Sequence, residues 1–349
     1  VKTLLAPCRT SMACIDRLVA SSPIAHGLTR TSSSRPKFFM ALAMAPMLPS
    51  WRGSINTILN LGTATAPVPH VYNSVADNLD VAADDRIAIK FAYDGASFLG
   101  FQRQPQGVTV EGTLVQALAR VGAISSAREC GYRSSSRTDR GVSALGNVVS
   151  IRTSFPLGAL CSALNSEMED VWAYSAVKVP DAFNPRAARQ RWYRYHLPKS
   201  GQDPDLLREV ADRFVGVHDF SGHARKDDRN PVRRIDSITV SDSGMFHAVD
   251  FRAESFLWNM VRRIVWMMNE GSSGRMDLDA IGPEPSKKPA RVGLAPAEYL
   301  VLMDIDCGVE FPVDTRAAVG IRRAVETRLR RSAMSLAFAG ELGGRTGEP

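Results

Sequence analysis

The chain has few of the residues that bind metals or build disulfide frameworks. Its 349 residues include five cysteines and six histidines. The cysteines are odd in number, scattered and without a CxxC pair, and the histidines show no ligand spacing, so we expect neither a zinc site nor a disulfide scaffold. Reduced thiols in an intracellular protein fit this usage best. The sequence also lacks nucleotide-cofactor and metal-binding motifs, and we expect no cofactor and no metal.

Long apolar runs are also missing. The most apolar stretch, residues 38–48, is interrupted by Pro46 and is far shorter than the ~20 residues of a membrane-spanning helix. We therefore expect no membrane anchor. Hydrophobic residues still make up 44% of the chain, which is enough for a folded core, and the length allows two domains or one large domain with tails.

Acidic residues are scarce in residues 1–80, which also lack clear helix or strand periodicity. This segment is rich in Ser, Thr, Ala, Met and Pro, and before Asp77 its only acid is Asp16. It could be a disordered or misassigned extension, an organellar transit peptide or, least favoured, a folded accessory domain. We favour the disordered or misassigned extension and leave the segment out of the fold prediction.

The net charge of +7 is unevenly distributed along the chain. Residues 1–80 carry seven Lys and Arg against three acids, and residues 312–349 carry seven against four, which leaves 29 of each sign between 81 and 311. Because the central block is neutral, an RNA site there must come from local clustering of charge. Residues 315–337 have the pattern of a basic amphipathic helix, which would contact RNA or a partner subunit or simply be solvated.

One loop gathers positive charge around a single carboxylate. Asp139 lies between Arg137 and Arg140, with Arg133 just upstream, in the run RTDRGVSALG (residues 137–146). Guanidinium groups suit phosphate oxygens as well as a carboxylate, which indicates chemistry on a nucleic acid. The alternative is a structural ion pair.

Strands alternating with a few helices, in two similar-looking halves, indicate an α+β fold with an antiparallel-rich sheet. We predict helices at residues 110–122, 203–215 and 255–265. We predict strands at residues 86–93, 148–151, 171–179, 189–197, 234–240, 245–253 and 293–305, and turns at 94–95 and 216–220.

Two predicted elements carry residues of unusual chemistry. In the strand at 189–197, alternation puts Tyr193 and Tyr195 on one face and Trp192 and Arg194 on the other. A tyrosine there could stack on a base, although paired tyrosines are more often core packing. The helix at 255–265 is apolar nearly all round, so Arg262 within it needs a partner or must reach solvent.

Several of these stretches resemble the tRNA pseudouridine synthase A family, most closely its archaeal members, over residues 86–307. The matching runs are YDG with GFQRQ (93–104), RTDRGVSALG (137–146), RWYRY (191–195), GVHDF (216–220), FLWNMVR (256–262) and APAEYL (295–300). Phe101 stands where the family has tryptophan, and Trp192 replaces a family arginine.

The resemblance implies roles for individual residues. Asp139 is implied as the essential catalytic residue, Arg262 as its ion-pair partner, and Tyr193 as the ring that lies against the target uracil. Further implied or candidate substrate contacts are Arg137, which would fill the space of the extruded nucleotide, and Arg140, Arg186 and Leu300. For Leu300 a core position is an equally good interpretation.

The resemblance also implies an activity and an architecture. The activity is isomerisation of uridine to pseudouridine in the anticodon stem-loop of tRNA, at positions 38–40, by a cytoplasmic homodimer (or an organellar one if residues 1–80 are a transit peptide). The pseudouridine synthase fold would form an N-terminal catalytic half (81–198) and a C-terminal half (199–311) with an RNA cleft between them, followed by the basic tail (312–349). The alternatives are a catalytically silent RNA-binding protein and a nucleoside or glycoside hydrolase, although glycosidases generally use two carboxylates and only one stands out here.

Overall fold

The computed structural model describes residues 85–224, 230–283 and 292–345. The extension predicted for residues 1–80 lies outside these ranges, as do residues 225–229 and 284–291. Among the helices that are described, none is both long enough and apolar enough to cross a membrane.

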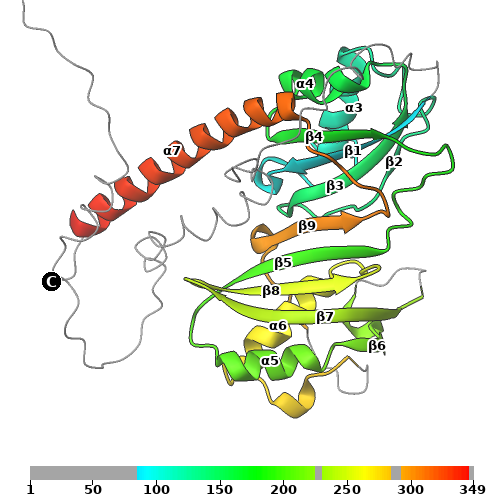
Figure 1. Cartoon of the computed structure of the whole chain (residues 1–349). Coiled ribbons are helices and arrows are strands. Elements are labelled where there is room, and N and C mark those ends of the chain that lie inside the picture. Colours follow the sequence, from blue (N-terminus) through cyan, green and yellow to red (C-terminus); the bar gives the residue numbers. More distant parts are fainter. Residues whose placement is uncertain (1–84, 225–229, 284–291, 346–349) are drawn as a thin grey trace, which may run out of the picture. The chain divides into compact units, whose positions relative to one another are not determined.

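A single mixed sheet runs through the described part of the chain (Figure 1). It has nine strands in the order β4-β1-β3-β9-β5-β8-β7-β6, with β2 paired to β3. All of the pairs are antiparallel except β3 with β9. The predicted α+β class with an antiparallel-rich sheet is therefore confirmed. The strands are β1 (Arg86–Tyr93), β2 (Arg133–Ser134), β3 (Ser143–Arg152), β4 (Val171–Lys178), β5 (Gln190–Pro198), β6 (Gly216–Asp219), β7 (Val232–Ser243), β8 (Phe246–Ala253) and β9 (Leu300–Asp306).

Five α-helices accompany the sheet in the described ranges. They are α3 (Val110–Arg120), α4 (Leu157–Glu167), α5 (Pro204–Asp212), α6 (Met260–Ser272) and α7 (Thr315–Arg345). The starts of α3 and α5 follow from local chemistry. The Thr109 side chain accepts a hydrogen bond from the Gly112 amide, and Asp203 caps α5 just before a proline at its first position.

Some predicted bounds were wrong. The helix expected at 255–265 begins only at Met260 and runs on to Ser272, because Asn259 has a left-handed backbone (φ 65°) that cannot continue a helix. The strand expected at 293–305 begins only at Leu300, because Pro296 and a 3-10 turn, η6 (Ala297–Tyr299), precede it.

Other differences concern edge elements. The turn predicted at 216–220 is mostly a short edge strand, β6, paired with β7. The basic helix predicted at 315–337 continues to Arg345. Helix α4 and strand β2 were not predicted.

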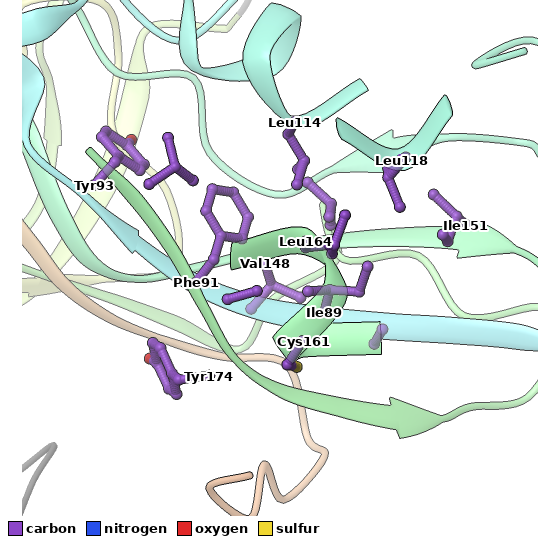
Figure 2. Packing of buried hydrophobic residues seen from close by; sticks show 14 of the residues in the cluster. Ile89, Phe91, Tyr93, Leu114, Leu118, Val148, Ile151, Cys161, Leu164 and Tyr174 are labelled. Carbon is purple, nitrogen blue, oxygen red and sulfur yellow. The ribbon is translucent and has the colours of Figure 1, made fainter. Parts of the chain in front are cut away.

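Two hydrophobic clusters lie along the sheet. In the first, Leu114 and Leu118 of α3 and Leu164 of α4 pack with Ile89 and Phe91 of β1, as Figure 2 shows. The second gathers residues of α5, α6 and the β5–β8 pair. Strand β9 contributes to both clusters, since Leu302 belongs to the first and Leu300 to the second. The division into halves at 198/199 stays a prediction.

The alternation predicted for β5 is confirmed by side-chain contacts. Trp192 and Arg194 both donate to the Asp250 carboxylate at 2.8 Å, whereas Tyr193 and Tyr195 pack against the rings of Phe256 and Tyr299. The two faces of the strand therefore serve different purposes, one polar and one aromatic.

A glycine turn after β1 fixes the start of β3. The Gly95 amide donates to Ser143 Oγ at 3.0 Å. A β-carbon at Gly95 would lie 2.3 Å from the backbone carbon and oxygen of Val142, so only glycine allows this approach. The turn and the Asp139 loop are thus packed backbone to backbone.

We predict that Gly95→Ala lowers the free energy of unfolding by about 2–4 kcal/mol, because the added methyl group must push the Val142 backbone away. Urea unfolding followed by circular dichroism measures this. Gly158→Ala is the matched control, since a β-carbon there meets nothing within 4 Å and alanine is the better helix former in α4. Equal stabilities for Gly95→Ala and wild type would contradict the packing argument.

Candidate active site

Buried polar groups form hydrogen bonds with the inner side of the loop that carries Asp139. Tyr93 and Thr138 share a hydrogen bond between their hydroxyls at 2.8 Å, and the Phe101 amide donates to the Thr138 carbonyl at 3.1 Å. Asn147 of β3 donates to the Ser136 carbonyl at 3.0 Å. Ser136 and Thr138 are buried, while Asp139 between the two exposed arginines is only partly covered. The loop is therefore anchored on its inner side and presents the Asp139 carboxylate outward.

Both oxygens of that carboxylate receive a donor from one distant segment. The indole Nε1 of Trp258 donates to Asp139 Oδ1 at 2.9 Å, and Nη1 of Arg262 lies 3.4 Å from Oδ2. The Arg262 side chain is 13% exposed, and its Nε donates to the Ala295 carbonyl at 2.7 Å. The pairing of Asp139 with Arg262 that the sequence predicted is present in the structure. The indole donor was not predicted.

Tyr193, on the aromatic face of β5, lies near enough to this carboxylate for the Asp139 charge to raise the pKa of its hydroxyl. Its ring meets Phe256 edge to face, with centroids 5.4 Å apart. Burial raises the pKa of the Tyr193 hydroxyl to about 12, while Arg191 and a hydrogen bond with Ser136 act in the opposite direction. The phenol therefore stays neutral at physiological pH and offers an apolar ring rather than a proton-transfer group.

Beneath the loop lies a second buried guanidinium, that of Arg191, which the sequence reasoning missed. Its Nε donates to Ser136 Oγ at 3.0 Å and its Nη2 to the Arg186 carbonyl at 3.0 Å, with Ser135 Oγ at 3.5 Å. Its Nη1 donates to the Glu254 carbonyl. Burial lowers the pKa of Arg191. Its position two residues before Tyr193, on the same face of the strand, was the signal that could have found it.

Arg191 therefore joins three pieces of backbone with one side chain. They are the start of the Asp139 loop, the approach to β5, and the end of β8, from which the chain leads to Trp258 and Arg262. A buried cation costs free energy unless its N–H groups are paired. Here they are paired with hydroxyls and carbonyls.

The remaining predicted site residues lie farther out or deeper in. Arg137 and Arg140 are exposed on either side of Asp139, and Arg186 is exposed. Leu300 is 5% exposed and belongs to the second hydrophobic cluster, opposite Tyr195 in the β5–β9 register. The structure thus brings Asp139 and Arg262 into contact and places Tyr193 within electrostatic range of the same carboxylate. It leaves the three arginines open to solvent and places Leu300 in the core.

Metal ligands are not clustered in the part of the chain that the structure describes. Within residues 85–224, 230–283 and 292–345, no group of three or more His, Cys, Asp or Glu side chains could hold a metal ion.

Comparison with known proteins gives consistent matches. A family model described as tRNA pseudouridine synthase matches residues 210–306. The tRNA pseudouridine synthase A of Pyrococcus abyssi is 44% identical over 71% of this chain and 95% of its own length. The enzyme of the same name from Pyrococcus horikoshii is 43% identical over 70% and 94%, and that from Methanoculleus marisnigri is 39% identical over 65% and 86%.

Among solved structures, a Cbf5-Nop10-Gar1 complex aligns with 52% of this chain and 44% of the matched chain. The sequence identity is 12% and the TM-score is 0.29, values at which the likeness carries no argument. The close sequence relatives, in contrast, agree with the archaeal resemblance noted in the motifs.

We predict that Arg191→Met lowers the free energy of unfolding by about 2–4 kcal/mol, because it leaves buried hydroxyls and carbonyls without their donor. Chemical denaturation measures the loss. The control is Arg189→Met, on an exposed arginine two residues earlier, which should stay within about 0.5 kcal/mol of wild type. If both variants are equally stable, Arg191 does not hold the three segments together.

Proposed function

This chain belongs to the tRNA pseudouridine synthase A family of isomerases, and from that premise we propose that it converts uridine to pseudouridine in the anticodon stem-loop of tRNA, at positions 38–40, with Asp139 as the essential carboxylate. The choice of stem-loop rests on the family resemblance. The choice of Asp139 rests on the motif and on its surroundings in the structure.

The reaction is an isomerisation and needs no net redox change. The C1′–N1 bond breaks and its electron pair leaves with the uracil. The base turns, C5 bonds to the same C1′, and the proton on C5 is removed while N1 gains one. Asp139 acts either by attacking the sugar carbon or by removing a sugar proton, and both routes require an ionised, oriented carboxylate close to the ribose.

One observation carries the proposal: a single carboxylate has a donor on each oxygen. The Trp258 indole and the Arg262 guanidinium approach the two oxygens of Asp139 at 2.9 and 3.4 Å. Such contacts orient the group, and Arg262 supplies a compensating positive charge in a largely buried position. A nucleoside or glycoside hydrolase of the usual kind would need a second cooperating carboxylate, and the site offers no comparable partner among the described residues.

A uridine inside a stem must leave the base stack before it can reach this carboxylate. The neutral, partly buried Tyr193 ring beside Asp139 supports a stacking role against the extruded uracil, a type of contact worth ~1–3 kcal/mol per base. Arg137 would occupy the space that the nucleotide leaves. Arg140 and Arg186, both exposed, would contact phosphates, and Leu300 would pack behind the base.

Four parts of the proposal rest on the family resemblance alone. They are the anticodon stem-loop, the restriction to positions 38–40, the homodimeric state and the cytoplasmic location. A catalytically silent tRNA-binding protein is the second candidate, because the same exposed arginines would bind RNA without turnover.

We predict that wild type forms pseudouridine in the anticodon stem-loop of unmodified tRNA transcripts, read by chemical mapping of modified positions. Asp139→Asn should reduce turnover by about 10³-fold or more, since the lost group acts directly in the reaction. Its tRNA affinity should remain within a few-fold of wild type. Asp205→Asn, on a carboxylate whose side chain is 92% exposed, is the matched control and should turn over normally.

The possible outcomes separate the parts of the proposal. If modification depended on Asp139 but occurred outside positions 38–40, only the proposed position specificity would be wrong. Full turnover by Asp139→Asn would remove the catalytic assignment. If wild type binds tRNA but leaves every uridine unchanged, the silent RNA-binding protein is correct.

A further inference from the structure

Helix α7 is fixed to the body by its first half. The Asp314 carboxylate accepts from the amides of Arg316 and Ala317 at 2.8 and 3.0 Å and caps the helix. Ala317 and Ile321 are buried in the first hydrophobic cluster. The start of the helix lies near the middle of β4, because the Asp314 amide donates to the Tyr174 carbonyl at 2.8 Å. The helix is therefore docked on the body and is not a loose tail.

Arg328 fixes the direction of α7. Its guanidinium bonds to the carboxylates of Asp94 and Asp170 and lies 5.2 Å from the ring centroid of Trp172. Asp170 and Trp172 flank the first residue of β4, so the helix runs back along this strand from Tyr174 to the strand's beginning. Figure 1 shows α7 leaving the body in this direction, past α4 and β4.

That end of the sheet is the one where the Asp139 loop enters β3. Tyr93 pairs with Val171 of β4 on one side and with Ala144 of β3 on the other. The part of α7 beyond Arg328 therefore projects past the end of the sheet that carries the candidate active site. Its last sixteen residues, 330–345, extend about 24 Å at the rise of an α-helix.

The charge of α7 differs from that of the body. The helix contains seven arginines and two glutamates, whereas residues 81–311 carry equal numbers of each sign. Apart from Arg328, its arginines are exposed and make no ion pair with acids in the described part of the chain; they are Arg316, Arg322, Arg323, Arg330, Arg331 and Arg345. A neutral body gives little long-range attraction for a polyanion, so the electrostatic attraction of the described residues is concentrated on this helix.

We propose that the exposed arginines of α7 form a second tRNA-binding surface, which contacts the phosphate backbone away from the nucleotide that is modified. This inference rests on tRNA being the substrate, as in the family, but not on the role of Asp139. Guanidinium groups bind phosphate oxygens in bidentate fashion, and such contacts position a nucleic acid without reading its sequence. Contact between the α7 helices of two copies through this face would instead bring like charges together.

The test compares the salt dependence of tRNA binding in two triple variants. The first, Arg323→Gln/Arg330→Gln/Arg331→Gln, removes three charges from α7. The second removes three charges from the body at exposed arginines that already have local acid partners, Arg120→Gln/Arg208→Gln/Arg234→Gln. Filter binding of unmodified tRNA between 50 and 200 mM salt gives the slope of log K against log[salt].

Each lost phosphate contact reduces the magnitude of that slope by about 0.7–0.9, so the slope of the triple α7 variant should be smaller by about 2–3. Its kcat/KM should fall with its affinity. The body variant should keep the wild-type slope and turnover. An unchanged slope in the α7 variant, or equal losses in both variants, would overturn the proposal. If the α7 variant had an unchanged slope and a different molecular mass from wild type in sedimentation, the helix would contact another protein chain, and the proposal would be wrong.

This result is independent of the catalytic assignment. If Asp139→Asn remained active but the α7 variant still lost slope, the second surface would stand and only the assignment of the carboxylate would fail.

Discussion

The site depends on two hydrogen bonds to one carboxylate, in which Trp258 and Arg262 each donate to one oxygen of Asp139. Trp258 and Arg262 lie 119 and 123 residues beyond Asp139 in sequence, so only the tertiary fold brings these groups into contact. The backbone conformation of Asn259 allows both residues to reach the same carboxylate. Its left-handed backbone ends the non-helical segment, so that Trp258 precedes the helix and Arg262 lies in its first turn, and both reach the same group.

The groups below the carboxylate explain why the loop keeps its shape. The Arg191 guanidinium donates to a hydroxyl and to backbone carbonyls of the segments that meet below the loop, and not to a carboxylate. Because its acceptors are neutral, it does not compete with Arg262 for Asp139. Tyr93, Thr138 and Asn147 fix the inner side of the loop through buried hydrogen bonds. The loop is thus held by hydrogen bonds on its inner side, while Arg137 and Arg140 on either side of Asp139 are exposed to solvent. A catalytic carboxylate held in this way is preorganised.

The sequence predicted what local periodicity encodes. Strand β1, helix α3 with its Thr109 cap and helix α5 follow from alternation, helical spacing and capping residues. The Asp139–Arg262 pair came from the family resemblance, because no spacing rule links residues so far apart. The Trp258 contact was missed for the same reason, since it is a long-range hydrogen bond of a group that looks ordinary in sequence. Arg191 was missed although strand alternation puts it on the same face as Tyr193, because its hydrogen-bond partners are far away in sequence. The position of β9 between β3 and β5 could not be predicted from local sequence patterns either. Pairing between distant strands depends on the packing of the whole sheet.

We propose that Asp139, Tyr193 and Arg262 surround one extruded pyrimidine. The most direct measurement is a crystal structure of the Asp139→Asn protein with unmodified tRNA bound. We expect a uridine of the anticodon stem-loop to be turned out of its stack, with its base against the Tyr193 ring and its ribose next to residue 139. A bound tRNA whose uridines all remain stacked, or whose extruded base lies away from these three residues, would contradict this proposal.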